Sequence, residues 1–376
     1  MKRVYLDWAS AAPVHPTAAR AYERAANMWG NPASPHEEGR AAKEVLEEAR
    51  RTIALMAGVK SDAVVFTSGA TEANGISIRG HVKALGRAPG DVHLLYVPSG
   101  HSSTVKAMEA LTLEGYDVEP LVLTDEKLDL EAIKLQVKDT TALVAVDLIC
   151  GETGTRFDTR GLKQVLGPKA LLLVDASQAP LVESFERTRL ACDLITLDAA
   201  KVGGVRGIGV LIASSTVKLS PIIEGGGQER GIRSGTQTPA LAAAFARALT
   251  EAMKGREAFV LRALTMRTEF IKALSKEIPE VRVNGGKEPA PHIVNLSLPG
   301  IDTEYLAALL DADGIAVSTR SACETDSVRS RAVFALTGDE ERARRTLRVS
   351  FGPSTSSKEL ETLTKALIRN VRFLKG

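Results

Sequence analysis

Short apolar runs alternate with longer segments of helical periodicity along most of the chain. The runs expected as strands cover residues 4–7, 64–67, 92–97, 118–123 and 142–148, and two more begin at Leu171 and Cys192. Helical patterns cover residues 16–29, 37–56 and 71–85, and further helices begin near Ser102, Asp129 and Asp158. Because strands alternate with helices, the pattern predicts an α/β fold with a mostly parallel, doubly wound sheet.

The pattern changes after a glycine-rich loop at residues 225–236. A helical pattern then runs from about Pro239 to Lys276, and a helix of that length usually leaves one domain and enters another. Shorter strands and helices follow, as in an α+β unit. We therefore expect a large domain over residues 16–250 and a small C-terminal domain over residues 251–376, with residues 1–15 packed against the small domain.

Composition and charge exclude several classes of partner. The chain has 376 residues, 44% of them hydrophobic, which is enough for a large buried core. Its 48 Lys and Arg residues nearly balance 46 Asp and Glu residues, so we expect no membrane partner and no direct contact with nucleic acid. The basic residues Arg329 and Arg331 are expected on a solvated helix face. Three cysteines and no segment resembling a signal peptide favour a cytoplasmic protein.

The main candidate chemistry lies between Leu171 and Gly209. Two apolar runs end there in polar residues, and parallel strands would bring Asp175, Gln178 and Lys201 to one edge of the sheet. A lysine and a carboxylate held together suit pyridoxal 5'-phosphate, which needs an amine for a Schiff base and an anion beside its ring nitrogen. The alternative is a structural ion pair at the sheet edge.

Two other segments carry candidate groups. Residues 68–72, Ser-Gly-Ala-Thr-Glu, follow a strand and start a helix, so their backbone N–H groups suit a phosphate, although the same residues also form ordinary helix caps. Cys323 lies among serines, threonines and charged residues, which favours an exposed, reactive thiol. Cys192 begins an apolar run instead and is expected in the core.

Several motifs occur together in a fixed order. They are Tyr5-Leu-Asp7 with Pro13-Val14, Gly30-Asn-Pro-Ala-Ser34, Thr67-Ser-Gly-Ala-Thr-Glu72, His101, Val174-Asp-Ala-Ser-Gln178, Lys201, Glu229-Arg-Gly-Ile-Arg-Ser-Gly-Thr236, Ser321-Ala-Cys323 and Arg348-Val-Ser-Phe-Gly352. With these motifs, essentially the whole chain resembles the cysteine desulfurases. These are pyridoxal 5'-phosphate enzymes of the class V aminotransferase group, and they supply sulfur for iron–sulfur clusters and thiolated nucleosides. The resemblance implies a fold-type I enzyme.

The resemblance implies a cofactor contact for each matching residue. Lys201 would form the Schiff base with pyridoxal 5'-phosphate and move protons at the substrate carbon, and His101 would stack on the ring as an acid/base group. Asp175 would bond the ring nitrogen, and Gln178 the ring hydroxyl. The phosphate contacts would come from Gly69, Ala70, Thr71 and the position of Asp198, and from Thr236, which would reach the neighbouring subunit. A homodimer with shared active sites is therefore implied.

The resemblance also implies groups that bind the substrate and accept its sulfur. Arg348 would grip the carboxylate of L-cysteine with its planar fork, and Asn31 would also contact the substrate. Cys323 would take the sulfur as a persulfide while L-alanine leaves. The persulfide would then pass to a sulfur-acceptor protein or an iron–sulfur scaffold, for iron–sulfur cluster assembly or tRNA thiolation. No metal site is expected.

Some positions depart from the family pattern. Asp198 and Ala200 stand where relatives carry a serine and a histidine that contact the phosphate. A carboxylate there is unfavourable unless it is turned away, protonated or paired, for instance with Arg206. Cys150-Gly151 replaces an asparagine pair near the ring. Two alternatives stay open: another class V reaction, such as selenocysteine lysis or transamination, and a weakly catalytic sulfur-transfer partner.

Overall fold

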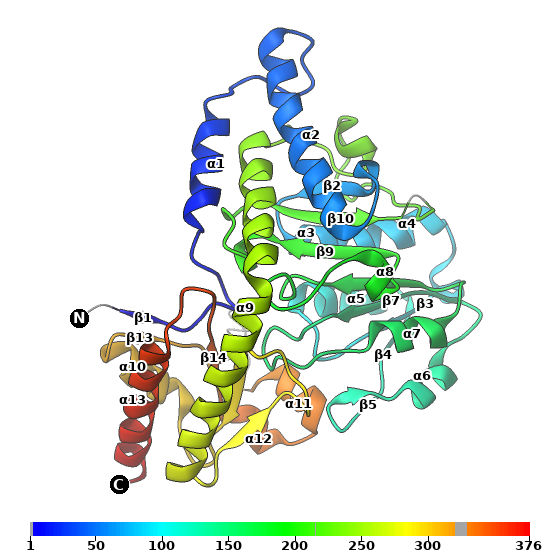
Figure 1. The fold of residues 1–376 in the computed structure, drawn as a ribbon. Helices are drawn as coiled ribbons and strands as arrows, with labels where there is room; N and C mark the ends of the chain where they lie inside the picture. Colours follow the sequence, from blue (N-terminus) through cyan, green and yellow to red (C-terminus); the bar gives the residue numbers. More distant parts are fainter. Residues whose placement is uncertain (1–2, 215, 320–328) are drawn as a thin grey trace.

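The computed structural model describes residues 3–214, 216–319 and 329–376. Its centre is a seven-stranded sheet with the strand order β2-β10-β9-β8-β7-β3-β4 (Figure 1). The strands are β2 (Val64–Thr67), β3 (His93–Tyr96), β4 (Asp117–Pro120), β7 (Thr141–Asp147), β8 (Leu171–Asp175), β9 (Leu194–Asp198) and β10 (Gly209–Ala213). Neighbouring strands pair in parallel except for the two pairs that β10 forms, with β2 and with β9, which are antiparallel. The prediction of a mostly parallel α/β sheet is confirmed.

Helices cover the faces of this sheet, which explains why its inner strands are unbroken apolar runs. Every residue of β7 is buried, as expected for a strand that is covered on both sides. The helices of this part are α1 (Pro16–Ala26), α2 (Glu37–Ala57), α3 (Ala70–Gly75), α4 (His81–Leu85), α5 (Ser102–Leu113), α6 (Leu130–Gln136), α7 (Thr159–Leu166) and α8 (Arg187–Leu190). A separate hairpin consists of β5 (Leu123–Thr124) and β6 (Lys127–Leu128).

The single helix expected over residues 71–85 is divided into three segments. A π-helical stretch, Ile76–Gly80, separates α3 from α4. The backbone of Ser220 crosses the helix at this stretch, and its N–H donates to the carbonyl oxygen of Gly80 at 3.0 Å. A Cβ on Gly80 would lie 2.6 Å from the carbonyl oxygen of Ser220, so only glycine permits this approach.

A smaller group of elements lies at the lower left of Figure 1. Its antiparallel sheet contains β11 (Arg282–Asn284), β12 (Ile293–Ser297) and β14 (Thr346–Ser350), while β1 (Val4–Tyr5) pairs with β13 (Ile315–Ala316). The helices are α10 (Thr303–Ala312), α11 (Arg331–Thr337), α12 (Glu340–Arg344) and α13 (Ser357–Lys375). The long helix α9 (Pro239–Glu277) packs against α1, α2 and α13 and so joins both parts of the molecule. In the ranges that the structure describes, no helix is long and apolar enough to cross a membrane.

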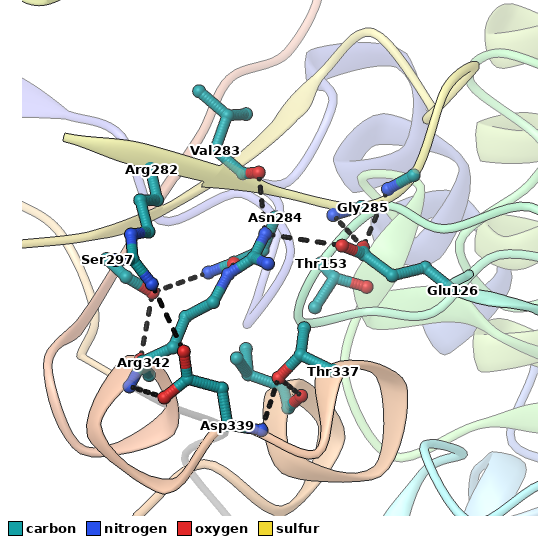
Figure 2. Close-up of polar contacts among 12 residues, drawn as sticks. Glu126, Thr153, Arg282, Val283, Asn284, Gly285, Ser297, Thr337, Asp339 and Arg342 are labelled. Atoms are coloured by element: carbon teal, nitrogen blue, oxygen red, sulfur yellow. Dashed lines mark hydrogen bonds and ion pairs between the residues drawn. The ribbon is translucent and has the colours of Figure 1, made fainter. Parts of the chain in front are cut away.

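Hydrogen bonds connect the β5–β6 hairpin to residues next to the smaller sheet. Its two turn residues, Asp125 and Glu126, have positive φ angles of 51° and 60°. The Glu126 carboxylate accepts hydrogen bonds of 2.7 Å from the backbone N–H groups of Gly285 and Gly286 and one of 3.2 Å from Arg342 Nη2 (Figure 2). We call these four residues, Glu126, Gly285, Gly286 and Arg342, the Glu126 cluster. The hairpin also contacts α11, the helix that follows Cys323 in the chain.

Candidate active site

A pocket lies at the carboxyl ends of the central strands. Lys201, in the turn after β9, lines it together with Gln178, which follows β8, and His101, which caps the N-terminus of α5. Arg348 enters the pocket from β14 of the smaller sheet. The fold thus brings together four candidate residues from four separate segments of the chain.

The amine of Lys201 points at the segment that follows β1. Its Nζ atom donates to the carbonyl oxygens of Ala9, at 3.0 Å, and Ser10, at 2.7 Å. The side-chain amide of Gln178 also donates to the Ala9 oxygen, at 2.9 Å. A Cβ on Gly151 would lie 3.1 Å from Gln178 Nε2, so glycine at this position leaves room for the Gln178 amide.

His101 is joined to Asp175 by two residues for which the sequence gives no signal. His101 Nδ1 lies 2.7 Å from Ser103 Oγ, and Asn74 Nδ2 donates to that hydroxyl at 2.9 Å. Asn74 also donates to Asp175 Oδ2 at 2.8 Å, while Asp175 Oδ1 accepts from the N–H of Ser177 at 3.0 Å. An asparagine and a serine inside helices belong to no recognisable motif, so only the fold reveals this connection.

Asp147 is a second buried carboxyl group beside the pocket. It ends β7 in direct register with Asp175 at the end of β8, and parallel strands place such partners on the same side of the sheet. Burial and the nearby charge of Asp175 raise the pKa of Asp147 to about 8. One of its oxygens accepts from the backbone N–H of His101 at 3.0 Å. Asp147 could not be predicted as a site residue from the sequence, because it lies within an apolar run.

Arg348 is held by one ion pair and by neighbouring backbone. Its Nη2 atom contacts Asp7 Oδ1 at 2.9 Å and also donates to Ser10 Oγ, while Nη1 donates to the carbonyl oxygen of Gly151 at 3.0 Å. Its Nε atom is buried and has no hydrogen-bond partner in the described chain. A buried N–H without a partner is unfavourable. The Nε–H is therefore available to donate to an anionic ligand.

The expected phosphate end of the site contains a carboxylate of the protein itself. Asp198 Oδ2 accepts from the N–H of Ala70 at 3.0 Å, and Oδ1 accepts from the N–H of Ala200 at 2.8 Å. A Cβ on Gly69 would lie 3.1 Å from Asp198 Oδ2. The suggested pairing with Arg206 is wrong for the conformation seen here, because backbone N–H groups near the start of α3 and after β9 bind this carboxylate instead.

Seven of the described candidate residues are not part of the pocket lining within this chain: Asn31, Gly69, Ala70, Thr71, Asp175, Asp198 and Thr236. Asn31, Thr71 and Thr236 are all exposed, and Asn31 Oδ1 accepts only a local bond from the N–H of Ala33 at 2.9 Å. Their roles in binding substrate or phosphate stay predictions.

One buried and one half-buried ion pair anchor the glycine-rich loop that carries Thr236. Glu229 accepts bonds of 2.7 and 2.9 Å from the guanidinium of Arg50 and one of 2.9 Å from the N–H of Phe66. Burial alone would raise the pKa of Glu229, but its bonds with Arg50, with Gln237 and with the N–H of Phe66 together lower it. Arg233 in turn contacts Glu72 at 3.0 Å. The loop is therefore fixed to the residues on both sides of the Ser-Gly-Ala-Thr turn.

The cysteines differ in their surroundings. Cys323 lies outside the described residues. Cys192 is buried, as predicted, and burial raises the pKa of its thiol to about 12. Cys150 lines the pocket but is also buried, and its pKa is raised to about 11. Both therefore remain neutral thiols near pH 7 and are poor nucleophiles.

Arg331 corrects the expectation of a solvated basic face. It stands at the first position of α11, lines the pocket and donates to the carbonyl oxygens of Pro98 and Gly100, the latter at 2.7 Å. These contacts join the helix after Cys323 to the turn before His101. The sequence does not predict this role, because a basic residue in a helical pattern is expected on a solvated face.

One group in the described chain has metal-ligating chemistry, and it lies at the other end of the strands. His93 and Asp117 begin β3 and β4, and Glu119 completes the group. Lys138 Nζ contacts Asp117 at 2.8 Å and also pairs with Glu119, so an ammonium group already binds both carboxylates. The cluster is thus a charge network at the sheet edge opposite the pocket.

Comparison with known proteins identifies the family of the chain. The model of the aminotransferase class-V family matches residues 4–363. The chain belongs to this family. It is 32% identical to the putative cysteine desulfurase IscS 1 of Bacillus subtilis, with all of both proteins covered. It is also 32% identical to cysteine desulfurase IscS 1 of Archaeoglobus fulgidus, with 96% of this chain and 95% of the relative covered.

Solved structures show the same architecture for this class-V chain. A NifS-like protein superposes with a TM-score of 0.92 at 25% identity, covering 99% of this chain and 100% of the other. The structure described as SspA in complex with cysteine superposes with a TM-score of 0.80 at 25% identity, covering 94% and 99%. The expected resemblance to the cysteine desulfurases and the fold-type I architecture are confirmed.

Proposed function

We propose that this class-V chain is a pyridoxal 5'-phosphate-dependent cysteine desulfurase that converts L-cysteine to L-alanine. The observation that carries the proposal is that Lys201, His101, Gln178 and Arg348 line one pocket. Full-length similarity to proteins named cysteine desulfurases supports the reaction class. The same similarity supports L-cysteine as the substrate, as does the neighbour described as SspA in complex with cysteine.

The residues of the pocket fit the proposed cofactor. An amine, an amide and an imidazole share the pocket, and Asp175 is buried close by and hydrogen-bonded to Asn74. When bound, pyridoxal 5'-phosphate supplies an electron sink for charge at the substrate α-carbon. Lys201 would hold it covalently, Asp175 and Gln178 would bond the ring, and residues 69–71 would bind the phosphate with Thr236 of a second copy.

The pocket residues then have separate tasks. The Nε atom of Arg348, buried without a partner, would bind the carboxylate of L-cysteine and orient the amino acid. Lys201 would accept and return the proton at the substrate α-carbon. His101 would exchange a proton at the substrate side of the pocket, since its Nδ1 atom is already bonded to Ser103.

Cys323 would receive the sulfur. Its thiolate attacks the sulfur of the bound substrate, so that the carbon–sulfur bond breaks and a sulfur–sulfur bond forms. The substrate carbon gains a hydrogen and leaves as L-alanine, while the protein keeps a persulfide. A sulfur-acceptor protein or an iron–sulfur scaffold would take this sulfur. The homodimer, the division into domains near residue 250 and the cytoplasmic location stay predictions.

Trapping of the cofactor tests the lysine assignment. Borohydride treatment of the full-length protein with added pyridoxal 5'-phosphate should fix the cofactor on Lys201, and peptide mass spectrometry locates it. Lys201→Ala should abolish this adduct, whereas Lys218→Ala should retain it. An unchanged pattern of modified lysines in Lys201→Ala would refute the assignment.

A further inference from the structure

Asn74 is a buried amide whose two N–H hydrogens and carbonyl oxygen are all hydrogen-bonded. Its Nδ2 atom donates one hydrogen to Asp175 Oδ2 at 2.8 Å and the other to Ser103 Oγ at 2.9 Å. Its Oδ1 atom accepts from the hydroxyl of Thr196 at 2.7 Å. A flipped amide would place its oxygen against the Asp175 carboxylate, so these partners fix its orientation. Ser103 Oγ therefore receives a hydrogen from Asn74.

The hydroxyl of Ser103 has only one hydrogen of its own, and this hydrogen has an acceptor at close range. Ser103 Oγ lies 2.7 Å from His101 Nδ1, and the backbone N–H of Ser103 donates to the same nitrogen at 3.2 Å. Two donors directed at Nδ1 require a lone pair there. In a neutral imidazole, the hydrogen then lies on Nε2.

We propose that Asn74 and Ser103 are positioning residues, which link Asp175 to His101 and hold the neutral His101 ring with its proton on Nε2. Each hydrogen bond in the chain fixes the direction of the next one. The carboxylate thereby selects the histidine tautomer through two neutral side chains. The catalytic consequence rests on the proposed function: with Nδ1 occupied, His101 exchanges protons with a bound substrate through Nε2.

The tautomer can be measured without any catalytic turnover. The chain has six histidines, so ¹⁵N NMR of histidine-labelled full-length protein is tractable, and His101→Gln assigns the signal. Wild-type protein, with or without added pyridoxal 5'-phosphate, should show a protonated Nε2 and a lone pair on Nδ1 of His101. A proton on Nδ1 would overturn the proposal.

Substitution of Ser103 tests whether its hydroxyl sets the tautomer of His101. Ser103→Ala removes one of the two donors at Nδ1 and should raise the minor tautomer about five- to tenfold, whereas Ser103→Thr keeps a hydroxyl and should preserve the wild-type ratio. Thr112→Ala removes a hydroxyl elsewhere on α5 and should leave the ratio unchanged. An unaltered ratio in Ser103→Ala would show that the hydroxyl has only a packing role.

Kinetics then separate this proposal from the proposed function. Ser103→Ala should lower kcat for L-alanine formation about tenfold and change KM less than about twofold, with Ser103→Thr restoring most of the rate. An equal loss of kcat in Ser103→Ala and Ser103→Thr would contradict a role for the Ser103 hydroxyl in positioning His101. If wild-type protein forms no L-alanine, the proposed reaction fails, while the NMR result still decides the tautomer.

Discussion

Asp147 makes the stability of the folded chain depend on pH. In the unfolded chain its carboxyl group loses its proton near about pH 4, whereas in the folded protein its pKa is raised to about 8. Between these values the folded state binds more protons, so its stability falls as pH rises. The effect of one fully buried carboxyl group is on the order of several kcal/mol.

Asp147→Asn should flatten this dependence. Asparagine keeps an oxygen for the N–H of His101 but has no proton to lose, so the variant should gain stability over wild type as pH increases from about 5 to about 8. Urea unfolding at a series of pH values provides the measurement. Asp139→Asn, at a side chain that is 96% exposed, is the matched control. Parallel curves for Asp147→Asn and wild type would show that the buried carboxyl does not titrate as described.

Asp198 should weaken binding of the phosphate of the cofactor. Its carboxylate accepts from the same Ala70 N–H that the family resemblance assigns to the phosphate, and two anions there repel each other. Asp198→Ser should therefore bind pyridoxal 5'-phosphate about ten- to a hundredfold more tightly, as should Asp198→Asn. Equilibrium titration followed by cofactor absorbance measures the Kd. Asp158→Asn, at the N-cap of α7, is the control, and unchanged affinity in both Asp198 variants would remove the proposed competition.

Only part of the candidate site could be predicted residue by residue. Lys201, Gln178 and His101 follow strands or start helices within recognisable motifs, and the fold does place them in one pocket. Asn74 and Asp147 could not be found in this way. An amide in a helix and a carboxylate at the end of an apolar run are recognised as site residues only through their contacts in the folded chain. Their partners come from other segments of the chain.

At the scale of elements, short segments are the ones that the sequence does not predict. The β5–β6 hairpin has two-residue strands, and its turn uses Asp125 and Glu126 at positive φ, where Asn-Gly would give a clear signal. The energy of this conformation, about 1 kcal/mol or more for each residue, is offset by tertiary bonds such as those of the Glu126 cluster. Such bonds cannot be inferred from local pattern.

Glu126→Ala should destabilise the chain by about 1–3 kcal/mol, because two backbone N–H groups and Arg342 lose an acceptor. Glu126→Gln should recover part of this loss, since its amide oxygen still accepts hydrogen bonds. Urea unfolding measures the difference, with Glu131→Ala at an exposed position of the neighbouring helix α6 as control. Equal stability of Glu126→Ala and Glu131→Ala would mean that the cluster contributes nothing.

For the whole molecule, the hydrophobic periodicity of the sequence predicts the layers of helices and strands. It does not predict that the N-terminal segment pairs with strands near the C-terminus. The buried strands and the long helix α9 follow directly from apolar runs and helical spacing. The pairing of β1 with β13, and of Asp7 with Ser350, joins residues more than 300 positions apart and has no local signal. This pairing nevertheless builds the site, because Ala9 and Ser10 bond Lys201 and Asp7 bonds Arg348.

The central claim concerns the whole molecule, since the proposed reaction transfers sulfur from a pocket at the large sheet to Cys323, which lies in sequence between strands β12 and β14 of the smaller sheet. Formation of L-alanine from L-cysteine by the full-length protein with pyridoxal 5'-phosphate tests it most directly. The assay compares wild type with Cys323→Ala and with Cys192→Ala, which removes a buried, neutral thiol. We predict L-alanine from wild type and Cys192→Ala and only background from Cys323→Ala. Undiminished L-alanine from Cys323→Ala, or none from wild type, would contradict the account.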